Sequence, residues 1–132
     1  MAAIQERNTS RFAGDHYQLP VKAGTKIFAG TLVAIDATGH AIPAKAAENL
    51  IAAGRAELTH DNTSGTDGDM IAVVARGVFK WDNDSTNAVD QADVGQDCYM
   101  LDDETVTSDA TGKSVAGKVL HVDPDGVIVE TR

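Results

Sequence analysis

The stretch from Val21 to Ile42 constrains the fold of this chain more than any other. Leu32 to Ile35 is an apolar, β-rich run that is too short for a helix, and glycines bound the short apolar runs around it. Asp36 to Gly39 is a turn sequence, after which His40 to Ile42 returns and stops at Pro43. Strand, glycine-containing turn and returning strand in this order predict a β-hairpin.

The same plan recurs from Gly95 to Thr107. A glycine again precedes an apolar run, an acidic turn follows at Asp102 to Glu104, and the chain returns through Val106. Setting Gly30 beside Gly95 places Val33 on Cys98, Ile35 on Met100 and Ala41 on Val106. We therefore predict two related hairpins.

The remaining segments favour more strands and very little helix. Ala44 to Asn49 is the one place where we expect a helical turn, and Met70 to Trp81 reads as two strands or one bulged strand split at Gly77. The other expected elements are a glycine-kinked strand at 51–58, a loop at 60–69, and a final hairpin of 114–122 and 127–130 around an Asp-Gly turn. This pattern predicts an all-β fold, a small β-barrel or sandwich built of hairpins.

The first 18 residues lack both helical and strand periodicity and are expected to form an extended N-terminal arm, with residues 19–132 as a β-barrel domain. Isolated apolar and basic side chains in this region are candidate anchors on a partner, because an extended segment can add to a foreign sheet edge. They are Ile4, Arg7, Arg11, Phe12, Tyr17 and Leu19. Trp81, after Val78-Phe79-Lys80, would join them if it were exposed. The alternative is an arm that folds back on its own barrel.

Charge argues against nucleic acid as a partner. The formal net charge is −9, and Asp82 to Asp109 holds nine acidic residues with no lysine or arginine. Such a body repels a phosphate backbone. Residues 1–31, in contrast, carry four basic and two acidic residues. No apolar run reaches the ~20 residues of a membrane span or resembles a signal peptide, and a single cysteine, Cys98, suits a reducing compartment.

No motif indicates catalysis, a cofactor or a metal, so we expect a protein that is not an enzyme. Thr111 to Ser114 resembles the end of a phosphate-binding loop, but Thr107 stands where that loop requires glycine. Asp61 to Asp69 is rich in oxygen ligands but has no EF-hand spacing, and the histidines lack zinc-ligand spacing.

Taken in order, the glycine-turn-strand fragments resemble one family over about residues 17–130. They are Ala23-Gly24-x-x-Ile27-x-x-Gly30-x-Leu32-Val33-Ala34-Ile35-Asp36, Gly39-x-Ala41-x-Pro43-Ala44, Gly54-x-Ala56-Glu57, Asp61-Asn62, Gly65, Arg76-Gly77-Val78-Phe79, Val94-Gly95, Tyr99, Asp102-Asp103-x-Thr105-Val106-Thr107, Ala116-Gly117-x-Val119 and Asp125-Gly126-Val127. The series is similar to the small head-decoration, or cement, proteins of tailed bacteriophages.

This resemblance implies an auxiliary capsid protein that binds the outside of an assembled phage head and stabilises the shell. Its implied partners are the major capsid protein and further copies of itself, a trimer being favoured over a dimer, with no nucleic acid and no membrane. Its implied location is the virion surface after synthesis in the host cytoplasm. The arm up to His16 has no counterpart in the resemblance.

An alternative is a free-standing binding module without catalytic activity, for instance for surface glycans. Trp81, Tyr99 and the acidic loops would then form its binding surface.

Overall fold

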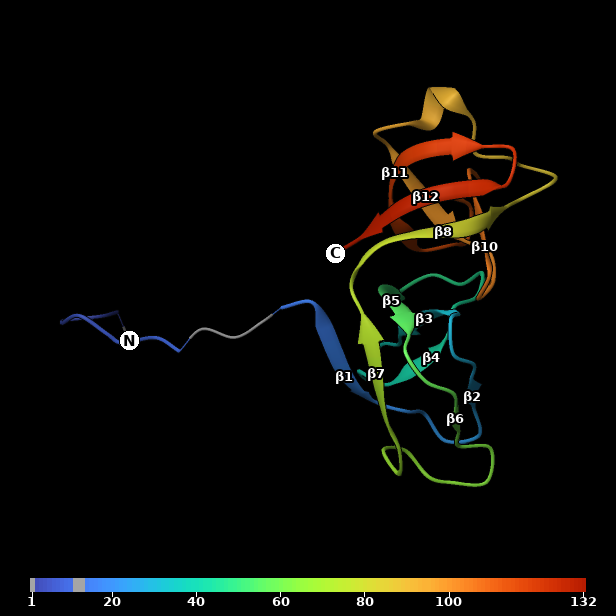
Figure 1. The fold of residues 1–132 in the computed structure, drawn as a ribbon. Coiled ribbons are helices and arrows are strands. Elements are labelled where there is room, and N and C mark those ends of the chain that lie inside the picture. The colour runs from blue at the N-terminus through green and yellow to red at the C-terminus, as the bar shows by residue number, and fades with distance from the viewer. Residues whose placement is uncertain (1, 11–13) are drawn as a thin grey trace.

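The computed structural model describes residues 2–10 and 14–132, and these form an almost entirely β structure (Figure 1). The first half of the chain builds a five-stranded sheet of order β1-β7-β5-β3-β4 and a two-stranded sheet of β2 and β6. The strands are β1 (His16–Pro20), β2 (Lys26–Ile27), β3 (Leu32–Ile35), β4 (Ala41–Pro43), β5 (Ile51–Ala56), β6 (His60–Asp61) and β7 (Ile71–Ala75). The predicted all-β fold is confirmed.

The second half closes into a five-stranded barrel of order β10-β8-β12-β11-β9, drawn in yellow to red at the top of Figure 1. Its strands are β8 (Gly77–Asn83), β9 (Asp97–Met100), β10 (Thr105–Thr107), β11 (Val115–Asp123) and β12 (Gly126–Thr131), with a 3-10 helix η1 (Gln91–Asp93) before β9. The apolar run from Met70 to Trp81 thus forms two strands. Only Arg76 separates them, and it carries the chain from the first sheet into the barrel.

The two halves repeat one strand plan with the same pairing register. Ile35 pairs with Ala41 and Met100 with Val106, so the hairpin correspondence predicted from Gly30 and Gly95 is confirmed. The match extends beyond the hairpins. The strand pairs β3–β5, β5–β7 and β7–β1 of the first unit correspond in order to the pairs β9–β11, β11–β12 and β12–β8 of the second unit. The chain is therefore a tandem of two similar five-stranded units.

A proline explains why only the second unit is a fully closed barrel. There, β8 and β10 pair in parallel, and the N–H of Asp82 donates to the carbonyl of Glu104 at 2.9 Å. In the first unit β1 meets β4 through the single bridge Val21↔Ala41. Pro20 occupies the position equivalent to Asp82, and proline has no N–H to donate, so the corresponding bond cannot form.

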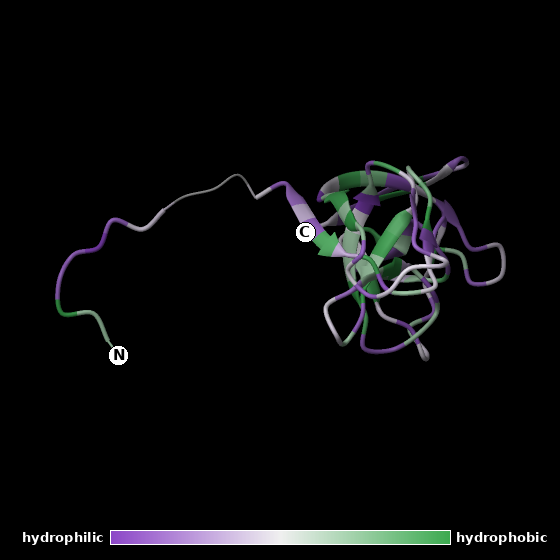
Figure 2. Ribbon diagram, turned by 90° about the horizontal axis from the view of Figure 1, so that it is seen from below, coloured by the Kyte–Doolittle hydropathy of each residue, from purple (hydrophilic) through white to green (hydrophobic). Residues whose placement is uncertain are grey.

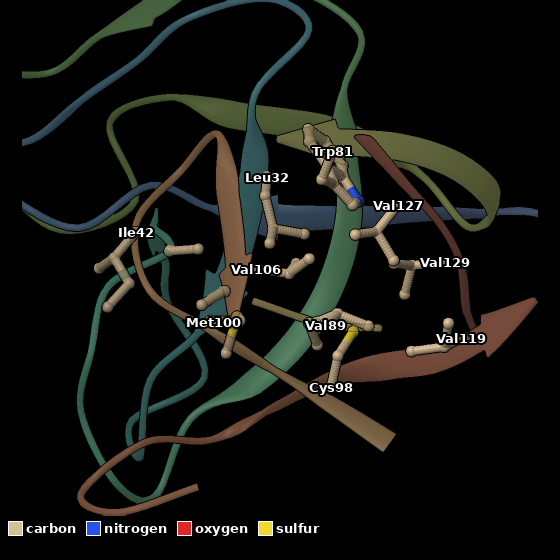
Figure 3. Packing of buried hydrophobic residues seen from close by; sticks show 13 residues of the cluster. Leu32, Ile42, Trp81, Val89, Cys98, Met100, Val106, Val119, Val127 and Val129 are labelled. Atoms are coloured by element: carbon tan, nitrogen blue, oxygen red, sulfur yellow. The ribbon is translucent and has the colours of Figure 1, made fainter. Parts of the chain in front are cut away.

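Buried apolar side chains form two clusters, one inside each unit, and one cluster reaches into the other unit. The second barrel is filled by residues such as Trp81, Met100 and Val106, but Leu32 and Ile42 of the first sheet pack among them (Figure 3). The other cluster fills the first unit beneath β1, β5 and β7. Figure 2 shows the apolar strands at the centre of the body.

Three expectations are corrected in detail. Residues 44–49 form bends and no helical turn, because Ala44 is drawn into the core and its N–H donates to the carbonyl of Leu32 at 3.0 Å. The loop at 60–69 contributes the short strand β6. The arm expected over residues 1–18 gives way to β1 at His16, so its last three residues belong to the first sheet.

Candidate interaction surface

The predicted anchors of the arm separate into three groups. Ile4 is 87% exposed and Arg7 is also exposed, within a segment, residues 2–10, that contains no strand or helix. No hydrogen bond joins residues 2–10 to the rest of the described chain. Arg11 and Phe12 lie outside the described residues. Tyr17 and Leu19 fall in β1 and belong to the body.

The junction of arm and body is held by Arg76, which sequence reasoning did not single out. Its backbone N–H donates to the carbonyl of Asp15 and its guanidinium to the carbonyl of Gly14, both at 2.8 Å. The guanidinium also lies over the Tyr17 ring at 5.4 Å, a cation–π contact. Tyr17, predicted as an anchor for a partner, therefore helps to fix the point from which the arm departs. Only the fold brings Arg76 and Gly14 together, since 62 residues separate them.

Leu19 and Trp81 are corrected from surface anchors to core residues. Leu19 is 8% exposed and packs into the first cluster, whereas Trp81 is 6% exposed and contacts Phe79, with the ring centroids 6.0 Å apart. Alternation along β1 and β8 turns both side chains inward. Because Trp81 is buried, the glycan-binding alternative loses its main aromatic platform.

The oxygen-rich loop 61–69 uses its carboxylates for hydrogen bonds within the protein: two of them accept in its own turns and one accepts from a distant segment. In the loop 61–69, Asp61 accepts from Thr63, Asp69 accepts from Thr66, and Asp67 accepts the N–H of Ala23 at 2.8 Å. The hydrogen bonds from Thr63 and from Thr66 lower the pKa of Asp61 and Asp69, respectively. Among the described residues, no three His, Cys, Asp or Glu side chains gather in a metal-binding arrangement.

The phosphate-loop fragment is also a closed turn. Lys113 donates to the carboxylate of Asp109 and to the carbonyl of Thr111, both at 3.1 Å, and only 13% of the Lys113 side chain is exposed. Its ammonium group is therefore already paired within the β10–β11 connection. As expected from the sequence, residues 111–114 form a turn between strands.

Asp36 at the β3–β4 turn is the carboxylate on which acid stability should depend most. Burial acts to raise its pKa, but hydrogen bonds from the Thr38 hydroxyl and from the N–H groups of His40 and Thr38 outweigh that effect and hold the pKa well below its usual range. A depressed folded-state pKa contributes stability that is present above the unfolded value of about 4 and is lost as the pH falls further.

We predict that Asp36→Asn destabilises the protein at pH 7 by about 1–2 kcal/mol, because charge-assisted hydrogen bonds are stronger than neutral ones. The difference between wild type and variant should shrink between pH 5 and pH 2.5, because the Asp36 carboxyl of the unfolded wild-type chain becomes protonated in this range while that of the folded chain stays ionised. Urea unfolding at several pH values measures this. Asp125→Asn is the control, since its side chain is 87% exposed. A difference that stays constant over this pH range would contradict the prediction.

The lone thiol contributes no reactive group to the surface. Cys98 is 1% exposed inside the second barrel, and burial raises its pKa to about 12. A thiol in this state reacts slowly with oxidants or alkylating reagents. Disulfide formation by cysteines introduced on the surface can therefore be measured without interference from Cys98.

Two exposed apolar side chains of the body lie on one groove. Ile51 of β5 is 62% exposed and Val115 of β11 is 43% exposed. Both line a groove of about 250 Å³ between the two units, which continues past Thr131 to Arg132. Sequence analysis missed the groove because the exposure of a strand residue depends on where the neighbouring strand stops.

None of the described residues forms a helix with the length and hydropathy that a membrane span requires. No family model matches the chain, and comparisons with curated proteins and with solved structures likewise found no match.

Proposed function

We propose that this chain is a capsid decoration protein, which binds the outer surface of an assembled phage head and stabilises the shell. The observation that carries the proposal is the arm, where Ile4 is 87% exposed, more than any other large apolar side chain of the described residues. An isolated aliphatic side chain on an unpaired segment gains free energy only when a partner covers it. The order of glycine-turn-strand fragments, similar to that of phage cement proteins, supports the same function.

The proposed partners are the major capsid protein and further copies of this chain. The arm, with Ile4, Arg7, Arg11 and Phe12, is the docking element, and the β body sits between shell subunits. The basic residues of the arm favour acidic patches on the shell or on a neighbouring copy. Each contact can be weak, because an oligomer that engages several shell subunits gains avidity. We favour a trimer over a dimer, located on the virion surface.

Co-sedimentation with undecorated heads tests this proposal. The full chain should saturate the heads at a fixed ratio to the major capsid protein. A variant without residues 2–13 should bind at least tenfold more weakly while its body stays folded. The deletion stops at residue 13 because Arg76 holds Gly14 and Asp15, and β1 begins at His16.

A pair of point variants separates the arm from general surface effects. Ile4→Asp removes an aliphatic anchor whose burial contributes about 1.5–3 kcal/mol, which corresponds to roughly a tenfold to hundredfold loss of affinity. Leu58→Asp makes a similar change on the body, where Leu58 is 59% exposed, and should bind like wild type. Unchanged occupancy by the deletion variant would refute the role of the arm, and no binding by the full chain would refute the function.

A further inference from the structure

The molecule offers few places where a foreign strand can add to its sheets. The barrel of the second unit is closed. In the first unit the seam between β1 and β4 ends in Pro20 on one strand and Pro43 on the other. Proline cannot donate to a strand ladder and blunts an edge against further pairing. The seam is therefore a poor acceptor.

The groove between the units differs from this seam, because each of its sides has a strand segment that pairs with no described strand on its outer edge. β7 pairs with β5 only at Arg55 and Ala56, so no described strand pairs with residues 51–53 on the side away from β3. β12 pairs with β11 only from Lys118 onward, so no described strand pairs with residues 115–116 on the side away from β9, although the Thr131 hydroxyl donates to the Ala116 carbonyl at 2.9 Å. The two unpaired segments are similar because of the repeat: Ala52 pairs with Ala34 in the first unit as Val115 pairs with Tyr99 in the second.

The tip of the arm has the chemistry that fits this groove. Ala2 and Ala3 are small enough to lie close to another backbone, and Ile4 is a β-branched side chain that is left uncovered. Ile4 and Gln5 lie in a bend in the structure, so the tip has to straighten in order to pair; once it is extended, Ile4 and Glu6 point to the same side. With Ile4 against Ile51 and Val115, the Glu6 carboxylate comes within reach of Arg132, which lines the end of the groove. Arg132 already donates from Nε to Glu130 at 3.1 Å, so Glu6 would bind the remaining N–H groups of the guanidinium.

The arm also leaves the body close to the groove. Arg76 holds Gly14, and the next residue, Gly77, pairs with Thr131, which lines the groove. No hydrogen bond joins residues 2–10 to the rest of the described chain, so the tip is free to meet another copy. When two or more copies meet with these regions side by side, each arm starts beside its neighbour's groove. Closed symmetry then allows every copy both to give an arm and to receive one.

We propose that the groove between β5 and β11 binds the arm tip, Ala2 to Glu6, of a second copy of this chain. The tip adds as a short strand, with Ile4 covering Ile51 and Val115 and with Glu6 paired to Arg132. This proposal rests on the proposed function and deepens it, because it names a neighbouring copy as the partner of the arm tip; the loss of head binding expected for Ile4→Asp would then follow from weaker association of the copies on the shell. It concerns the free protein and can be tested without phage heads.

Disulfide trapping between two singly substituted full-length proteins tests the exchange. One protein carries Ile4→Cys and the other, labelled with ¹⁵N, carries Val115→Cys; they are mixed, oxidised gently and analysed by intact mass. Because each protein has one introduced cysteine and Cys98 is buried, a mixed disulfide joins two copies. Val78→Cys replaces Val115→Cys in the control, since Val78 is also a strand valine with a similar exposure of 44%.

We expect at least tenfold more mixed disulfide with Val115→Cys than with Val78→Cys, since a disulfide needs Cα atoms within about 7 Å. Equal yields with the two partners would overturn the proposal. It would also be overturned if a chain carrying both Ile4→Cys and Val115→Cys formed the bond within one copy while the mixture gave only the control yield. Neither result bears on shell binding, which co-sedimentation measures independently.

Discussion

Gly54→Ala and Gly117→Ala are each expected to destabilise the fold by more than about 3 kcal/mol, the largest effect of any single methyl group added to this chain. The two glycines occupy equivalent positions in the repeat, opposite Val33 in β3 and Cys98 in β9. Their φ angles are +136° and +157°, a region that residues with a Cβ atom rarely adopt.

A close backbone contact adds to the cost at both sites. A Cβ on Gly54 would overlap the carbonyl oxygen of Ala75 in β7, and one on Gly117 would overlap that of Glu130 in β12. Both carbonyls belong to paired strands. Neither can move aside without breaking the ladder, so the clash cannot be relieved by a side-chain rotation.

Gly39→Ala separates the clash from the backbone strain. Gly39 also has a positive φ, +85°, but an added Cβ there meets no atom within 4 Å. It should therefore cost only about 1–2 kcal/mol, the penalty of the left-handed conformation. Urea unfolding followed by circular dichroism measures all three variants. If Gly54→Ala or Gly117→Ala cost no more than Gly39→Ala, the close strand approach would not be a requirement of the fold.

These glycines also mark how far the sequence could predict the fold. The hairpins at Leu32 and at Cys98 follow from local signals, glycine turns between short apolar runs, and their matching register was visible in the spacing. The full repeat was not visible, because its other pairings join residues far apart in sequence. Gly54 was noted as a kink within a strand, but its reason lies in Ala75, which only the folded sheet brings beside it.

For the candidate interaction surface, the sequence indicated which kinds of residues to expect but not where the fold places them. The arm and Ile4 follow from a segment with no periodicity. Leu19 and Trp81 were misplaced because an aromatic or aliphatic residue near a strand end can face either side, and a shift of one residue reverses the face. The groove at Ile51 and Val115 depends on where β7 and β12 stop pairing, which local sequence does not determine.

Leu32→Ala should destabilise the protein by about 3 kcal/mol and should do so for both units at once. Leu32 belongs to β3 of the first sheet, yet its fully buried side chain packs with the cluster that fills the second barrel (Figure 3). Its N–H also donates to the carbonyl of Asp103 in the β9–β10 turn at 2.8 Å. Replacing a buried leucine by alanine removes transfer free energy and leaves a cavity, which together cost about 2–5 kcal/mol.

Trp81 makes the coupling of the two units measurable. It is the single tryptophan and lies buried in the second barrel, so its fluorescence reports that unit, whereas circular dichroism reports the strands of both. We expect the two signals to change together in urea, in wild type and in Leu32→Ala, with the midpoint of the variant lowered. A two-state chain requires coincident transitions.

Leu58→Ala is the matched control, because Leu58 is 59% exposed and its truncation should cost less than about 0.5 kcal/mol. If the urea midpoint of the Trp81 fluorescence transition is lowered no more in Leu32→Ala than in Leu58→Ala, the barrel is stable without the first sheet. Two separate transitions in wild type would mean the same. Coincident transitions, together with a lower midpoint in Leu32→Ala, would instead mean that the two units unfold as one cooperative unit to whose stability the buried Leu32 side chain contributes.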